Sequence, residues 1–199
     1  AIPSLLAVSA VHHHLIETKK STSVSIILES GEPREVHHFA TLLGYGACAI
    51  NPYLAQFSIK KLVQDGLLKK DYYAAVNDYN NAVLHGIVKI ASKMGISTLQ
   101  SYQGSQIFEA VGISKKVIDE YFTNTVSRVE GITIEDIAED VDYHHSKAFD
   151  MLGLKNDLSL DSEGDHKYRS GKEEHLYNPL TIHTLQTAAW TNNYELFKQ

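Results

Sequence analysis

Short apolar runs alternate with helix-length amphipathic segments in the first part of this chain, and this alternation constrains the fold most. Residues 23–28 (SVSIIL) and 47–50 (ACAI) are brief and largely apolar. Such runs are typical of strands buried on both faces of a parallel sheet. Apolar residues at helical spacing precede each run, in residues 4–17 and 36–43. The order helix, strand, helix, strand with short connections predicts βα units and an α/β fold with a parallel sheet.

Further elements are predicted along the chain from periodicity and from helix start and stop signals. Ser114 is a plausible N-cap for one helix, and Thr133 with Asp136 forms a variant of the capping box for another. The predicted helices cover residues 54–68, 71–94, 106–111, 115–122 and 134–149, and a third strand is predicted at 96–99. Residues 155–174 are rich in polar and charged residues and predict a linker. A last helical segment follows at 180–190, with a short one at 194–197.

Charge and cysteine content exclude several classes of protein. The chain has 199 residues, a net charge of −6 and one cysteine. We therefore expect no nucleic-acid partner, no internal disulfide, no multi-cysteine zinc site and a reducing, cytoplasmic location. The apolar N-terminal stretch is too short to span a membrane. Because the sequence starts core-like and without methionine, we expect a piece of a larger protein that exposes apolar surface and self-associates.

Histidine is the residue type that most resembles a metal-binding pattern. Five of the eleven histidines cluster as His12, His13, His14, His37 and His38. Three or four ligands must converge on a transition metal, and consecutive helical residues point about 100° apart, so the triplet cannot supply them alone. Helix-end histidines bonded to carbonyls or to nearby glutamates are the favoured interpretation, with a metal site as the alternative. Cys48 is predicted to be a small buried core residue.

Polar side chains gather after the predicted third strand. These residues are Ser97, Thr98, Gln100, Ser101, Tyr102 and Gln103. Hydroxyl and amide groups at the carboxyl end of a parallel strand commonly face a ligand or a channel. A hydrogen-bonded polar turn explains the same pattern equally well, so both interpretations stay open.

Several segments, in order, resemble the large subunit of glutamate synthase. They are residues 10–15 (AVHHHL), 29–32 (ESGE), 34–39 (REVHHF), 44–46 (GYG), 49–55 (AINPYLA), 92–98 (SKMGIST), 106–112 (QIFEAVG), 121–123 (YFT) with Thr125, and 178–179 (NP) with 185–186 (LQ). The matches spread over almost the whole chain.

The resemblance implies an enzyme that makes two glutamates from glutamine, 2-oxoglutarate and a reductant. It implies FMN and a 3Fe–4S cluster for the parent enzyme, with ferredoxin or an NADPH-oxidising subunit as electron donor. Residues 1–154 would be the C-terminal part of the central domain, an incomplete (β/α) barrel-like structure, residues 155–176 a linker, and 177–199 the truncated start of the FMN-binding domain. Its partners would be the glutaminase and FMN domains of the same parent chain.

No catalytic, cofactor-binding or metal residue carries over from the family, because the family's nucleophilic cysteine begins the mature chain whereas this chain begins with Ala1, and the three cluster cysteines cannot be present when Cys48 is the single cysteine. The implied role is a structural connector, and Ser97 to Gln103 are candidates for the ammonia path or its interface. We expect the chain alone to bind no FMN and to show no glutaminase or synthase activity. A stand-alone histidine-rich module for metal or ligand binding is the alternative. A small independent α/β enzyme is a third, although no convergent base and nucleophile is found.

Overall fold

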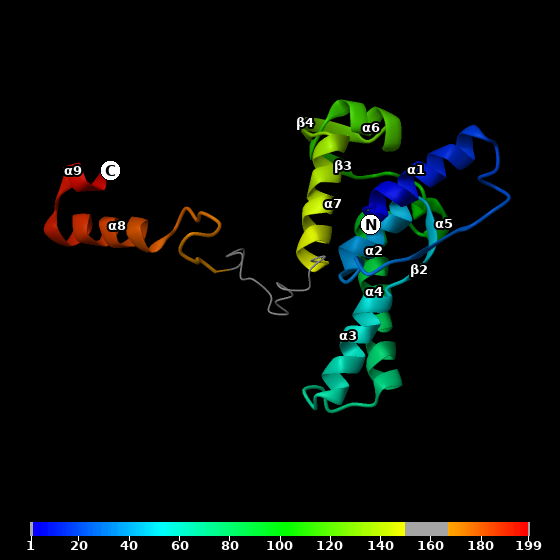
Figure 1. The fold of residues 1–199 in the computed structure, drawn as a ribbon, viewed down its shortest axis with the longest axis horizontal. Helices are drawn as coiled ribbons and strands as arrows, with labels where there is room; N and C mark the ends of the chain where they lie inside the picture. The colour runs from blue at the N-terminus through cyan, green and yellow to red at the C-terminus, as the bar shows by residue number, and fades with distance from the viewer. Residues whose placement is uncertain (1, 150–166, 199) are drawn as a thin grey trace. The chain divides into compact units, whose positions relative to one another are not determined.

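The computed structural model describes residues 2–149 and 167–198, which fall into two units, residues 1–148 and 149–199 (Figure 1). The first unit contains all the described strands. They form two separate parallel pairs, β1 with β2 and β3 with β4. The α/β class and the parallel pairing are therefore confirmed, and the barrel-like arrangement stays a prediction.

The first strand pair is a βαβ unit. Helix α1 (Ser4–Glu17) precedes β1 (Ile26–Glu29), α2 (Val36–Gly44) and β2 (Ala47–Asn51), which agrees closely with the predicted elements. One side of the pair, with Leu28 and Ile50, packs against Val8 of α1 and Leu42 of α2. The other side is open, since Ile27 is 73% exposed and Cys48 is also exposed. The prediction of strands buried on both faces, with Cys48 in the core, is wrong because helices cover only one side.

A long helix completes the main core. Helix α3 (Tyr53–Gln64) and α4 (Tyr72–Lys93) project together from the strands (Figure 1), and α4 packs on α2. Phe39 and Leu43 of α2 contact Val83 and Ile87 of α4 in this core. The helices can approach closely because α4 has a glycine at the contact: a Cβ atom on Gly86 would lie 2.5 Å from the side chain of Val36.

The second strand pair lies where sequence patterns gave the wrong elements. Residues 96–98 form no strand and lead into α5 (Leu99–Tyr102), and the helix predicted at 106–111 is instead the start of β3 (Glu109–Ile113). Positive φ angles of 68° at Gly104 and 51° at Gln106 are incompatible with a continuing helix. Helix α6 (Lys115–Tyr121) then crosses to β4 (Val126–Ile132), a strand that the sequence analysis did not predict.

The predicted caps of the next helices are confirmed. The side chain of Ser114 accepts a hydrogen bond from the amide of Val117 at 3.5 Å. Before α7 (Ile134–Ala148), the Thr133 amide donates to Asp136 Oδ2 at 2.7 Å and the Asp136 amide donates to Thr133 Oγ1 at 3.3 Å. These bonds satisfy amides that a helix start leaves free.

The second unit, described by itself over residues 167–198, contains α8 (Pro179–Thr191) and α9 (Tyr194–Phe197), close to the predicted segments. Asn178 caps α8 by accepting from the Thr181 amide at 2.9 Å, and Asn192 ends it with a φ of 50°. Of the predicted linker, residues 155–166 lie outside the described residues, and 167–174 contain no helix or strand. Among the described helices, none is long and apolar enough to cross a lipid bilayer.

Candidate functional site

The predicted polar segment starts on the surface of the first unit. Ser97, Thr98, Gln100 and Ser101 are exposed, and Thr98 Oγ1 lies 2.8 Å from Ser101 Oγ across the start of α5. Residues 96–99 line one side of a hollow of about 410 Å³, with α4 on the other side. This placement corrects the expectation that the hydroxyls stand at the end of a strand. They stand instead at the N-terminus of a short helix that packs beside α4.

Tyr102 differs from its neighbours because it is completely buried. Its ring packs among Phe39, Leu43, Val83 and Ile87 in the core between α2 and α4. Its hydroxyl forms no hydrogen bond with any described residue. Burial raises the pKa of the phenol, so the group stays protonated at neutral pH. A buried hydroxyl without a partner costs about 1–3 kcal/mol, which makes it an unusual feature of a well-packed core.

The side chain of Gln103, just after α5, bonds to the start of β2. Its side-chain Nε2 donates to the carbonyl oxygen of Ala47 at 3.0 Å and lies 2.8 Å from Sγ of Cys48. The amide thus satisfies a carbonyl at the start of β2. Of the six predicted site residues, Tyr102 is buried and Gln103 is partly buried, while the other four are exposed.

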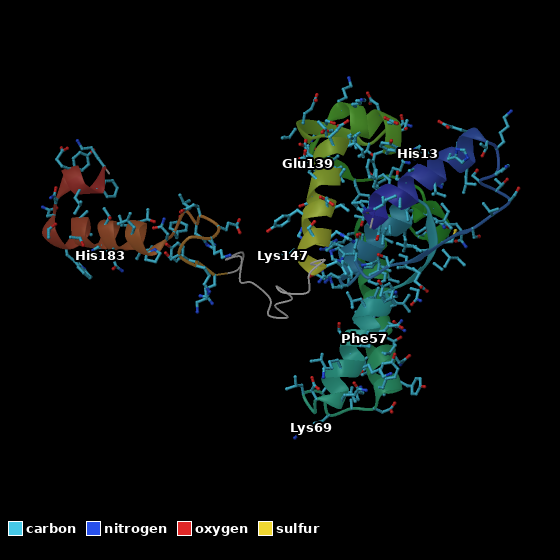
Figure 2. The ribbon with its side chains drawn as sticks, viewed as in Figure 1. His13, Phe57, Lys69, Glu139, Lys147 and His183 are labelled. Carbon is cyan, nitrogen blue, oxygen red and sulfur yellow. The ribbon has the colours of Figure 1, made fainter. Side chains whose placement is uncertain are left out.

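His12 and His13 of α1 contact the loop after α5, and His12 also contacts the turn between α2 and β2. The ring of His12 lies against Gly46 and Gly104, and a Cβ atom at Gly46 would stand 2.5 Å from its Nδ1. Burial, and then the neighbouring His13, lowers the pKa of His12. His13, on α1 (Figure 2), donates from Nδ1 to the carbonyl of Ser9 at 2.8 Å. Its Nε2 then accepts from Nε2 of Gln106 at 3.3 Å.

The second histidine pair also makes structural contacts. Nδ1 of His38 accepts hydrogen bonds from the amides of Arg34 and Glu35, at 3.1 and 3.3 Å, at the start of α2. Within residues 2–149 and 167–198, no three His, Cys, Asp or Glu side chains gather in a way that could hold a metal ion. The contacts of His12, His13 and His38 are those of histidines that hold helices and loops in place.

The sequence analysis could not separate Tyr102 from the exposed residues beside it. Its signal was weak: a single aromatic residue among hydroxyl and amide residues, on the side of α5 that faces α2 and α4. The components of this segment are a buried neutral hydroxyl, an amide bridge and exposed hydroxyls. Nothing in it activates a nucleophile.

Comparison with known proteins identifies the family of this chain. Residues 1–114 match the family model "Glutamate synthase central domain". The chain is 54% identical over 200 residues to the large chain of glutamate synthase [NADPH] from Bacillus subtilis (strain 168), which covers the whole chain and 13% of that protein. It is 43% identical over 194 residues to glutamate synthase [NADH] from Schizosaccharomyces pombe, covering 96% of the chain and 9% of that protein.

A third relative is the ferredoxin-dependent glutamate synthase 2 of Synechocystis sp., which is 39% identical over 221 residues, covering the whole chain and 14% of that protein. The chain thus spans about one seventh or less of the length of these relatives. The family match covers more than half of the residues, and the chain belongs to the glutamate synthase family, with the family's central domain over residues 1–114.

Proposed function

We propose that this chain serves glutamate synthase as a structural connector that spaces the glutaminase site and the FMN site and helps to form the ammonia path. The parent reaction converts glutamine, 2-oxoglutarate and reductant into two glutamates. In this proposal the chain has no chemistry of its own, and the parent enzyme works in the cytoplasm.

The observation that supports the path most strongly is the buried hydroxyl of Tyr102. Ammonia is small and neutral, and it can both accept and donate a hydrogen bond. A protonated phenol in an apolar core offers it one weak partner and no charge that would hold an ammonium ion. Gln103 supports this position through its bonds to Ala47 and Cys48. The exposed hydroxyls of Ser97 and Thr98 would meet the neighbouring domain at the mouth of the same path.

Neither the cysteine content of the chain nor the hollow described in the second unit suits the cofactors that the family implies. An iron–sulfur cluster needs several thiolates, and Cys48 is the single cysteine. An apolar hollow in the second unit lies between α8 and α9 with no lysine or arginine in its lining, and its helix start is already capped by Asn178. FMN carries a phosphate that would need such donors. In the proposal, FMN and the 3Fe–4S cluster are therefore held elsewhere in the parent enzyme.

The partners of the connector follow from its uncovered surface. Large apolar side chains are exposed on each unit, among them Ile27, Phe57 and Trp190, with exposed fractions of 62–79%. Surfaces of this kind mark interfaces. We assign them to the glutaminase and FMN domains of the parent chain. The relatives carry NADPH, NADH and ferredoxin in their names, so either ferredoxin or an NADPH-oxidising subunit fits as the donor.

A coupling experiment tests the path. Ser97→Ala with Gln100→Ala would be introduced into full-length glutamate synthase, and glutamine-dependent synthesis would be compared with ammonia-dependent synthesis. We expect glutamate formed per glutamine hydrolysed to fall, while ammonia-dependent synthesis and thermal stability stay unchanged. The matched control, Ser58→Ala with Gln64→Ala on the exposed surface of α3, should leave both activities unchanged. If both activities fall together with stability, or neither changes, the segment is only structural.

A further inference from the structure

The ring of His12 lies against two turns that are far apart in the sequence. One is the turn after α2, at Gly46, and the other is the loop after α5, residues 103–106. Gly46 and Gly104 have φ angles of 111° and 68°. A Cβ atom at Gly46 would lie 2.5 Å from Nδ1 of His12, and one at Gly104 would lie 3.4 Å from Nε2. Backbone from each turn therefore stands close to one nitrogen of the imidazole.

Two backbone hydrogen bonds hold the 103–106 loop on the end of α2. The amide of Gly104 donates to the carbonyl oxygen of Leu43 at 3.0 Å, and the amide of Gln106 donates to that of Gly44 at 2.9 Å. The loop belongs to no helix or strand. Its opening would therefore break few hydrogen bonds and can occur without unfolding of the core.

A positive charge on His12 would have no acidic partner. Titratable side chains on the elements that contact His12 are His13, His14 and Glu17 on α1, Tyr45 after α2 and Cys48 in β2. The ring centroid of His13 lies 6.0 Å from that of His12, and the 103–106 loop has no titratable side chain. In the part of the chain that the structure describes, no carboxylate forms an ion pair with His12. Protonation would thus place a cation beside another histidine and against backbone.

Protonation of His12 is easier when the 103–106 loop is open. Burial, and then His13, lowers the pKa of His12 in the closed structure. Burial weakens when water reaches the ring, so the open form has the higher pKa and binds the proton better. The closed form is therefore favoured fully above pH 6.5, and this preference is lost as pH falls towards the lower pKa of the closed form.

We propose that His12 is a pH-sensitive latch, whose neutral ring keeps the 103–106 loop closed on the turn after α2 and whose protonation releases the loop while the core stays folded. His13 is not the latch. Its Nδ1 donates to Ser9 and its Nε2 accepts from Gln106, whose amide can turn to accept instead when His13 is protonated. The inference stands on α1 and the two turns, and it does not depend on the ammonia path.

Hydrogen exchange of the full 199-residue chain, followed by NMR at about pH 7.0 and about pH 5.5, tests the latch. Each rate is divided by the intrinsic exchange rate at the same pH. Protection of the Gly104 and Gln106 amides should fall at least about threefold at the lower pH, because proton binding favours the open loop. The amide of Ile87 in α4 should stay at least about tenfold better protected at both pH values, because the loop opens locally.

Variants assign the response to one ring. His12→Phe keeps a ring without a titrating group, and His12→Asn keeps a polar group; both should remove most of the fall in protection, whatever the protection is at pH 7.0. His14→Asn, at an exposed position of α1, should keep the wild-type fall. Circular dichroism would establish that each variant is folded.

Three results would overturn the latch. The first is protection at Gly104 and Gln106 that does not change with pH, or a fall that both His12 variants retain. The second is a fall that His13→Asn abolishes, since the response would then belong to His13. The third is equal protection of the loop amides and of Ile87, since the opening would then be global unfolding.

Discussion

The two βαβ motifs of residues 1–148, which are β1–α2–β2 and β3–α6–β4, share a topology but differ in burial. In the first, α2 buries five of its nine residues between α1 and α4. In the second, α6 buries two of its seven residues, and β4 leaves Val126 and Val129 about half exposed. Helices pack around the first motif, whereas α6 and α7 bury much less of the second motif. Connectivity alone therefore does not fix local stability; the layers packed on the crossover helix do.

Truncation of a side chain should show the largest difference in stability loss between the two βαβ motifs. Phe39→Ala in α2 empties a packed site between α2 and α4, so we expect a loss of about 3–5 kcal/mol in the free energy of unfolding. Val129→Ala in β4 removes a half-exposed side chain and should cost under about 1 kcal/mol. Urea unfolding measures both. Equal losses in the free energy of unfolding would show that the second βαβ motif is buried as deeply as the first.

Glycine replacements give the next largest contrast. Gly46, between α2 and β2, has a φ of 111° and touches the His12 ring, so Gly46→Ala should cost about 2 kcal/mol or more. Gly112 in β3 has a φ of 75° and open space around it, so Gly112→Ala should cost about 1 kcal/mol. Thermal melts of the two variants test the order. A reversed order would mean that His12 moves aside without loss.

A buried hydrogen bond joins the two βαβ motifs. The hydroxyl of Tyr45, just after α2, lies 2.7 Å from Oγ1 of Thr125, just before β4. Tyr45→Phe leaves Thr125 buried without this partner, and we expect a loss of about 1 kcal/mol. Combining Tyr45→Phe with Thr125→Val should cost less than the sum of the single changes, because both partners are then removed. Strict additivity in chemical denaturation would argue that the bond contributes nothing.

The smallest effect is a pH dependence at His12. Burial lowers its pKa below the ordinary value of 6.5, so the unfolded chain binds more protons near that pH than the folded chain. The contribution of His12 to stability is therefore complete above pH 6.5 and is lost as pH falls through the lower pKa of the folded state. Unfolding measured between about pH 7 and pH 5 should show this loss, and His12→Asn should reduce the slope. An unchanged slope in the variant would assign the loss to other groups.

Sequence patterns predicted the first βαβ motif and most helices of the chain well and strands β3 and β4 poorly, and burial explains why. The bounds of α1 and the caps at Ser114 and Thr133 follow from local signals that tertiary contacts do not alter. Residues 96–111 carry turn-forming backbone at Gly104 and Gln106 that the apolar pattern does not reveal. β4 was missed because its exposed residues lack a buried strand's pattern. The orphaned hydroxyl of Tyr102 depends on residues distant in sequence, from Phe39 to Ile87, and no local pattern contains it.

The most direct test of the connector account is Tyr102→Phe in full-length glutamate synthase, with coupling and stability measured on the same preparation. Since the hydroxyl has no partner among the described residues, its removal should leave thermal stability unchanged or slightly higher. The account predicts that less glutamate forms per glutamine hydrolysed while ammonia-dependent synthesis stays at the wild-type level. Unchanged coupling in a stable Tyr102→Phe enzyme would contradict a role for this hydroxyl in the ammonia path.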